Sequence, residues 1–292
     1  MVKKIKFYNN FKISNIHKKS ILLVGNFDGL HLGHQKLFNL AKKYKKNFKL
    51  KIGVVTFEPI PKMYFNSKLK NFRISSKSQK IKILKNLGLD FLITKKFDKK
   101  FSNMKSYNFI KEVLYKKLNA KYIFVSNNFR FGNKREGNVK QLINNEKKYN
   151  YKIIKPKPFK LKNKIISSTL IRKLLSNGKI EFANKLLNRC WSVDGKVEKG
   201  RQLGKKIGFP TCNIDIKDYV LAKPGVYAVK IYRKNNNFPL KGIANLGYRP
   251  TFNQKKILLE VHIFNFHANL YNKHLTIELI NFIRKEKKFK NI

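Results

Sequence analysis

The sequence SILLVGNFDGLHLGHQKLFNLAKKY, residues 20–44, indicates the fold of the first half of this chain of 292 residues. It begins with an apolar run of strand length and continues through a turn rich in glycine. It ends in a segment whose apolar residues recur with helical spacing. A buried strand that passes through a tight turn into a helix is typical of a parallel βαβ unit. We therefore predict a strand at residues 20–25 and a helix at residues 31–44.

The same alternation continues to about residue 178. Strands are predicted at residues 51–59, 90–97, 120–126 and 151–156, and helices at 76–88, 106–118, 139–150 and 168–178. Strands that alternate with helices form parallel sheets covered on both faces. The predicted fold of this half is a doubly wound, Rossmann-like α/β domain.

The pattern changes near residue 188, where strands begin to follow one another without helices. They are predicted at residues 192–197, 225–232, 241–247, 257–266 and 275–282, separated by turns rich in Gly and Asn. Such a run of strands is typical of a small antiparallel β-barrel. We predict two domains, residues 1–183 and 184–292, with a short connection between them.

The composition is strongly basic, with 67 Lys and Arg against 15 Asp and Glu and a formal net charge of +52. The basic residues are spread from end to end, so we interpret them as compositional bias and expect no nucleic-acid partner. No apolar run is long enough to cross a bilayer, and the basic N-terminus lacks the pattern of a signal peptide. The two cysteines show no metal-binding spacing and favour a reducing compartment. We expect a cytoplasmic protein without a membrane partner, either a monomer or a weak homo-oligomer.

The glycine-rich turn carries the first candidate site. Gly25, Gly29 and Gly33 let the backbone approach a ligand closely, and the start of a helix is an anion-binding position. His31 and His34 are three residues apart in the first helical turn and therefore face the same way. A zinc site would need further ligands nearby, and a serine hydrolase would need a G-x-S-x-G turn, which is absent. The residues favour a phosphate-binding pair of histidines.

Two later motifs also carry polar residues in informative places. Ser167, Ser168 and Thr169 precede the apolar run LIRKLL, as the N-cap of a helix would. In LEVHIF, residues 259–264, alternation places Glu260 and His262 on the face opposite Leu259, Val261 and Ile263.

The whole set of motifs resembles one family. GNFDGLHLGH (25–34) looks like the HxGH signature of nucleotidyltransferases. The chain is similar, more narrowly, to the prokaryotic bifunctional riboflavin kinase/FMN adenylyltransferase (FAD synthetase) family. The stretches that carry the resemblance follow in order: TFEPIP (56–61), NNFRFGNKREG (127–137), ISSTLIR (166–172), GKKIGFPTCNI (204–214), GVYA (225–228), NLGYRPTF (245–252), LEVHIF (259–264) and RKEKKF (284–289).

For the first domain, the resemblance implies transfer of AMP from ATP to FMN with release of pyrophosphate. His31 and His34 would stabilise the α-phosphoryl transition state, and Arg172 would bind the β- and γ-phosphates. The residues implied to bind ATP are Gly25, Asn26, Phe27, Asp28, Gly29, Gly33, Ser167, Ser168 and Thr169. Those implied to border FMN are Phe57, Pro59, Asn128, Phe129 and Phe131; core packing is an equal interpretation for the last two. The family usually has Gly where this chain has Ser126, which would be strained if the position needs a positive φ.

For the second domain, the resemblance implies phosphorylation of riboflavin by ATP with Mg²⁺. Glu260 would be the general base for the ribityl 5′-hydroxyl, while a solvent-exposed edge-strand Glu is the alternative. The residues implied to bind ATP are Gly204, Gly208, Pro210, Thr211 and Asn213, of which Thr211 and Asn213 would also hold Mg²⁺. The residues implied to line the flavin or nucleotide are Asn245, Arg249, Thr251 and Arg284. Cys212 replaces the usual Ala, a change between small residues.

The family usually continues beyond RKEKKF with a helix, so we expect a C-terminally shortened barrel without that cover. The predicted function is FAD synthesis from riboflavin and ATP through FMN. Two alternatives stay open: an FMN adenylyltransferase with an impaired kinase domain and, more remotely, a basic nucleic-acid-binding protein. The predicted substrates and products are ATP, riboflavin, FMN and FAD.

Overall fold

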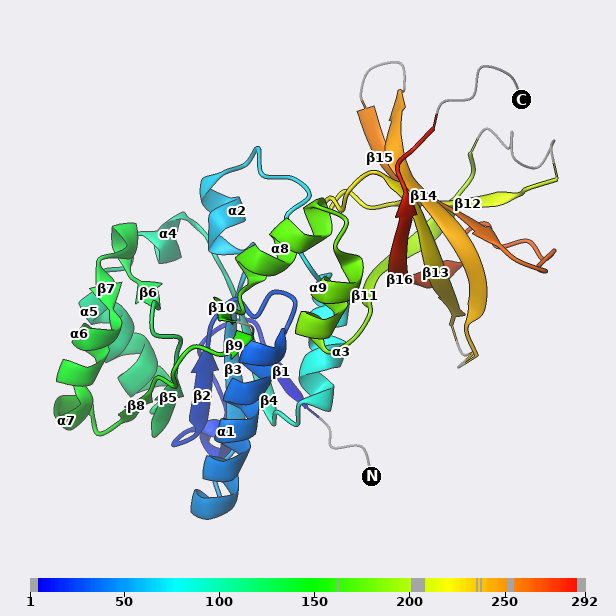
Figure 1. The fold of residues 1–292 in the computed structure, drawn as a ribbon. Helices are drawn as coiled ribbons and strands as arrows, with labels where there is room; N and C mark the ends of the chain where they lie inside the picture. The colour runs from blue at the N-terminus through cyan, green and yellow to red at the C-terminus, as the bar shows by residue number, and fades with distance from the viewer. Residues whose placement is uncertain are drawn as a thin grey trace. The chain divides into compact units, whose positions relative to one another are not determined.

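A computed structural model describes residues 5–161, 163–200, 208–234, 236, 238–250 and 255–287. The chain forms two compact units (Figure 1). The described residues up to Leu69 belong to the first unit, together with Lys80–Ile166. The second unit contains Lys70–Gln79 and the chain from Ser167 onward. Among the described residues, no helix is both long enough and apolar enough to cross a membrane.

A parallel sheet of six strands forms the centre of the first unit, as predicted. Its order is β1-β4-β3-β2-β5-β8. The strands that follow β2 along the chain are therefore added first on one side of it (β3 and β4) and then on the other side (β5 and β8). The strands are β1 (Lys6–Tyr8), β2 (Ile21–Val24), β3 (Ile52–Glu58), β4 (Phe91–Lys96), β5 (Tyr122–Phe124) and β8 (Lys152–Ile154). Ligands of such sheets bind at the carboxyl ends of the strands.

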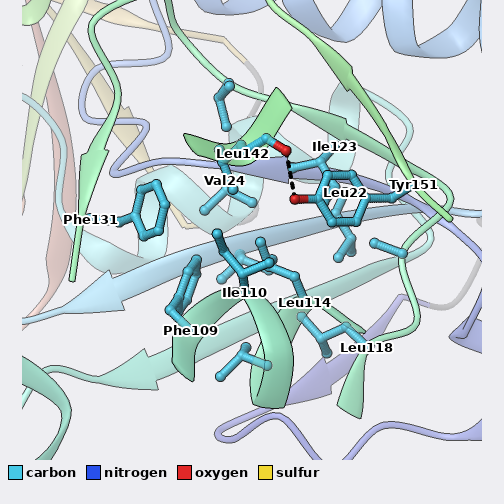
Figure 2. Packing of buried hydrophobic residues seen from close by; sticks show 14 of the residues in the cluster. Leu22, Val24, Phe109, Ile110, Leu114, Leu118, Ile123, Phe131, Leu142 and Tyr151 are labelled. Carbon is cyan, nitrogen blue, oxygen red and sulfur yellow. Dashed lines mark hydrogen bonds between the residues drawn. The ribbon is translucent and has the colours of Figure 1, made fainter. Parts of the chain in front are cut away.

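Side chains on both faces of this sheet are buried, because successive residues of a strand point to opposite sides. Ile21 and Leu23 of β2 pack into one apolar cluster, and Leu22 and Val24 pack into another. Figure 2 shows the second cluster, in which the Tyr151 hydroxyl donates a hydrogen bond to the Leu142 carbonyl at 2.8 Å. Burial on both faces explains why these strands read as continuous apolar runs.

The helices of the first unit connect these strands. They are α1 (Leu32–Phe48), α2 (Pro61–Phe65), α3 (Lys77–Asn86, whose first residues belong to the second unit), α4 (Lys99–Ser102), α5 (Ser106–Asn108), the π-helix Phe109–Lys117, α6 (Val139–Asn144) and α7 (Glu146–Tyr149). Short 3₁₀ turns lie at Asn15–His17 and Asn133–Arg135. Two small hairpins complete the unit: β6 (Arg130–Phe131) with β7 (Gly137–Asn138), and β9 (Lys160–Leu161) with β10 (Lys164–Ile165).

Several details of the first unit differ from the sequence prediction. The short helices α2 and α4 and the β9–β10 hairpin were not predicted, and the helix predicted at residues 106–118 is α5 followed by a π-helix. The strand β1 was missed because three residues at a sheet edge are too short for a periodic signal. The helix predicted at residues 139–150 is two helices that meet at Asn145. The loop predicted at residues 129–138 contains the β6–β7 hairpin.

The second unit holds a closed antiparallel barrel of six strands, as predicted. The order around it is β11-β12-β15-β14-β13-β16. The strands are β11 (Trp191–Glu198), β12 (Thr211–Asp215), β13 (Gly225–Arg233), β14 (Leu240–Pro250), β15 (Lys255–Ile263) and β16 (His274–Arg284). Two helices precede it, α8 (Ser168–Ser176) and α9 (Ile180–Leu187).

The strand β12 was missed in the sequence prediction, because its Thr, Cys and Asn residues lie in a glycine-containing motif that reads as a loop. Residues 70–79 also pack with this unit: the Trp191 indole N–H donates to the Ile74 carbonyl at 2.8 Å. Gly204 and Thr251, predicted to bind ligands, lie outside the described residues. For Arg249 only the backbone of β14 is described.

Candidate active sites

The first site is the turn between β2 and α1. The Gly25 N–H donates to the Val55 carbonyl at 3.0 Å, which ties the start of the turn to β3. Phe27 and Leu30 have positive φ values of 48° and 43°, and Gly29 has a φ of 77°. The chain thus reverses through several left-handed residues, which brings its backbone to the carboxyl end of the sheet. Asp28 is buried in this turn.

The two histidines of this turn lie face to face. His31 is the N-cap residue of α1, and His34 lies in the first helical turn. Their rings stack with centroids 3.8 Å apart and an angle of 22° between the planes. Gly33 leaves room for this packing, because a Cβ at this position would lie only 3.2 Å from the His31 ring. The structure thus brings both predicted residues together at a helix N-terminus, which attracts anions.

Burial makes His34 an uncharged imidazole near neutral pH. Desolvation lowers the pKa of His34 well below its usual value of about 6.5, and the neighbouring His31 lowers it further. Its Nδ1 atom is covered by protein and has no hydrogen-bond partner among the described residues. A neutral imidazole has one N–H donor and one acceptor nitrogen, so His34 can still donate to a phosphate oxygen.

A buried lysine next to this turn was not predicted. Lys80, at 6% exposure, donates to the Thr56 hydroxyl at 3.2 Å and approaches the Asn26 carbonyl at 3.5 Å. These contacts join the ends of β2 and β3 through one side chain. In a chain with so many lysines, no sequence signal distinguishes this one.

Three of the predicted FMN residues, all phenylalanines, share one apolar cluster of the first unit. Phe57 and Phe131 are buried in it, and the half-buried Phe129 packs against it. The Phe129 and Phe131 rings are stacked with centroids 5.6 Å apart. Both rings therefore contribute to core packing whether or not a flavin lies against them. Pro59 follows Glu58 through a cis peptide bond.

The loop before Phe129 tolerates its departure from the family pattern. Ser126 does not have a positive φ, so replacing the usual Gly causes no left-handed strain here. The Ser126 hydroxyl donates to Asn128 Oδ1 at 2.9 Å, and both residues are exposed.

In the second unit, α8 carries the predicted phosphate-binding residues. Ser167 is its N-cap, and the hydroxyl accepts a hydrogen bond from the Leu170 N–H at 3.2 Å, which confirms the predicted capping. Ser168 and Thr169 are the first two residues of the helix. Arg172 lies one turn further along; its Nε donates to the Phe72 carbonyl at 2.8 Å, and its guanidinium lies 3.7 Å above the Phe72 ring.

The barrel aligns three predicted residues that are far apart in the sequence. Glu260 of β15 is directly opposite Asn213 of β12 and directly opposite Asn245 of β14. Their side chains therefore form one row across three adjacent strands. Leu259 and Val261 are buried, so Glu260 and its row lie on the outer face of the barrel. In the described part of the chain, Asn213 Oδ1 and Asn245 Oδ1 are both buried without a hydrogen-bond partner.

Neighbouring residues extend this row. Asn213 is 5% exposed and packs against Gly200, where a Cβ would overlap its amide. Beyond Asn245 the row continues to Val226 of β13 and then to the exposed Arg284 of β16. Thr211 is two residues before Asn213 and therefore points to the same face.

The loop before β12 contacts His262 of β15. The Pro210 carbonyl accepts a hydrogen bond from His262 Nδ1 at 2.9 Å. Gly208 has a left-handed φ of 83°, which only glycine adopts without strain. No group of three or more His, Cys, Asp or Glu side chains that could hold a metal occurs within the described ranges.

Comparison with known proteins covers both units. Residues 13–170 match the family model described as FAD synthetase, and residues 187–292 match the one described as riboflavin kinase. A bifunctional riboflavin kinase/FMN adenylyltransferase of Buchnera aphidicola subsp. Schizaphis graminum is 42% identical, over 98% of this chain and 91% of that protein. The protein of the same name from Buchnera aphidicola subsp. Acyrthosiphon pisum is 39% identical, over 95% of this chain and 89% of its own length.

A solved structure is also similar over nearly the whole chain. It is described as a macrolide-efflux protein from Streptococcus pneumoniae, with a TM-score of 0.85 and 27% identity, covering 98% of this chain and 93% of that one. The two family models and the long, closely related sequences agree on one family. The chain belongs to the bifunctional riboflavin kinase/FMN adenylyltransferase family.

Proposed function

We propose that this enzyme makes FAD in two steps at the two sites described above. In the first step riboflavin and ATP give FMN and ADP, and in the second FMN and a further ATP give FAD and pyrophosphate. The FAD synthetase and riboflavin kinase matches support both activities in one chain. The observation that carries the proposal is the stacked His31–His34 pair at the start of α1.

Adenylyl transfer needs little covalent chemistry from the protein. An oxygen of the FMN phosphate attacks the α-phosphorus of ATP, and the bond from that phosphorus to the bridging oxygen of pyrophosphate breaks. We assign His31 and His34 to hydrogen bonding with the α-phosphate oxygens, where negative charge develops. Arg172 and the N-terminus of α8, with Ser167, Ser168 and Thr169, bind the β- and γ-phosphates.

For the flavin of this step we propose the contact residues that the family resemblance implied. Asn128, Phe129 and Phe131, with Phe57 and Pro59, border FMN in the proposal. The partial exposure of Phe129 supports this assignment, since an aromatic ring that is not fully buried can stack on an isoalloxazine.

Phosphorylation of riboflavin takes place at the barrel row. Glu260 accepts the proton of the ribityl 5′-hydroxyl as that oxygen attacks the γ-phosphorus of ATP, and ADP leaves. The nucleotide is proposed to bind at Gly204, Gly208, Pro210, Thr211 and Asn213. The flavin is proposed to bind at Asn245, Arg249, Thr251 and Arg284. The position of Glu260 between Asn213 and Asn245 supports the division.

Magnesium fits the residues of the barrel site. Mg²⁺ prefers hard oxygen ligands and usually takes one or two from protein and the rest from phosphates and water. Asn213 Oδ1 is such an oxygen, buried and without a partner in the described structure. Asn213 and the Thr211 hydroxyl would hold the ion, which neutralises phosphate charge when bound.

The remaining parts of the proposal concern organisation. We assign adenylyl transfer to residues 1–183 and the kinase to residues 184–292. We also propose that the protein acts in the cytoplasm as a monomer or weak homo-oligomer, without a nucleic-acid partner.

One assay tests the proposed function. The purified protein is incubated with ATP, Mg²⁺ and either riboflavin or FMN, and the flavins are separated by chromatography. We expect FAD from FMN, and FMN followed by FAD from riboflavin. FAD from FMN alone would remove the kinase and leave the adenylyltransferase. No product from either flavin would overturn the whole proposal.

A further inference from the structure

Glu286 follows the last barrel strand and belongs to the RKEKKF motif, yet no step above uses it. Its Oε1 accepts a hydrogen bond from Asn245 Nδ2 at 2.9 Å. A Cβ at position 247 would overlap the same oxygen, so Gly247 leaves the space in which this carboxylate lies. Glu286 is exposed, and its removal therefore takes nothing from the barrel core.

This contact determines which way the Asn245 amide points. A carboxylate only accepts hydrogen bonds, so the amide must turn its NH₂ group toward Glu286. The oxygen Oδ1 is then at the other end of the amide, where it is buried and has no partner in the described chain. An acceptor oxygen is thus held ready in the row that contains Glu260, the residue directly opposite.

We propose that Glu286 is a positioning residue of the riboflavin kinase site. It fixes the Asn245 amide so that Oδ1 accepts a hydrogen bond from a hydroxyl of the substrate's ribityl chain. This inference rests on the proposed function, in which Asn245 is on the flavin side of Glu260. A buried acceptor favours a ligand that brings a donor, because an unpaired buried oxygen is costly.

The test compares Glu286→Ala and Glu286→Gln with a matched control. Steady-state kinetics of riboflavin phosphorylation are measured, with separate KM values for riboflavin and ATP. We expect Glu286→Ala to raise the KM for riboflavin about 5- to 10-fold, which corresponds to one hydrogen bond, and to leave the KM for ATP unchanged. Glu286→Gln keeps an acceptor oxygen, so its KM for riboflavin should stay within about twofold of the wild type.

The control is a second Glu–Asn pair of the same unit. Glu181 accepts from Asn281 Nδ2 at 2.6 Å, outside the row of Glu260. Glu181→Ala removes the same kind of hydrogen bond and should not change the KM for riboflavin. An unchanged KM for ATP in riboflavin phosphorylation serves as the check that the barrel of each variant is folded.

Two further variants test the same contact if Glu286→Ala does not fold. Asn245→Asp cannot donate to Glu286 and should raise the KM for riboflavin, whereas the Asn245→Asp, Glu286→Gln double variant restores one donor and one acceptor and should reverse most of that loss. A wild-type KM for riboflavin in Glu286→Ala would overturn the inference, and so would a double variant no better than Asn245→Asp. A wild-type chain that does not phosphorylate riboflavin at all would instead refute the proposed kinase function.

Discussion

The two sites of this enzyme are built in opposite ways. The His31–His34 pair is local: a strand, a turn and the start of a helix bring the two residues together within one short stretch. The Glu260 site is non-local, since its row joins three strands through the register of a closed barrel. A local site can be read from a motif, whereas a barrel site depends on every strand having the correct register.

The largest effect is expected when the proposed general base of the barrel site, Glu260, is replaced. Glu260→Gln keeps the size of the side chain but accepts no proton, so riboflavin phosphorylation should fall about 100- to 10,000-fold. Adenylyl transfer from ATP to FMN should be unchanged. Glu278→Gln, a change of another barrel glutamate on β16, should leave both rates as they are. Full riboflavin phosphorylation by Glu260→Gln would remove Glu260 from its role.

The next largest effect is expected at the turn between β2 and α1, where the other activity should be lost. His34→Ala removes a proposed hydrogen-bond donor to the α-phosphate, and adenylyl transfer should fall about 100- to 1,000-fold. Phosphorylation of riboflavin should continue at the wild-type rate. The exposed His267 supplies the control, because His267→Ala should affect neither reaction. An equal loss of both activities in His34→Ala would contradict the separation of the two sites.

A smaller effect separates capping from phosphate binding at α8. Ser167→Ala removes the cap and should lower the free energy of unfolding by about 1 kcal/mol. Ser167→Asp restores the cap but places a negative charge where a triphosphate is proposed to bind. We expect its stability to be close to the wild type and its KM for ATP in adenylyl transfer to rise. If Ser167→Asp binds ATP normally, the N-terminus of α8 has only a structural role.

The smallest expected effect is on the free energy of unfolding at acidic pH. Well above pH 6.5, the ordinary pKa of histidine, His34 is neutral in both the folded and the unfolded chain. As the pH falls below that value, the unfolded chain binds a proton that the buried ring resists, because its pKa is lowered by burial. The free energy of unfolding should therefore fall more steeply in the wild type than in His34→Asn. Denaturant titrations at several pH values would measure this, and parallel profiles would show that folding does not lower the pKa of His34.

Most of the architecture could be predicted from the sequence, because periodicity and turn residues are local signals. The strand–turn–helix at residues 20–44 and the change to consecutive strands near residue 188 both predicted the correct folds. The strands β1 and β12 were missed, since one is very short and the other is rich in polar residues. Their existence depends on pairing partners elsewhere in the chain.

The sites were predictable to a different extent. The stacked histidines follow from helical spacing, although their close approach and the burial of His34 do not. The alignment of Asn213, Glu260 and Asn245 required the register, which no motif encodes by itself. Lys80 and Glu286 were missed because each looks like an ordinary charged residue until its contacts are known.

We propose that one chain contains two independent sites connected by FMN. The most direct test mixes equal amounts of Glu260→Gln and His34→Ala with riboflavin, ATP and Mg²⁺, and follows the flavins over time. We expect each variant alone to make no FAD from riboflavin, and the mixture to make FMN first and then FAD. A mixture that produces no FAD, although His34→Ala alone releases FMN and Glu260→Gln alone adenylylates added FMN, would contradict the account.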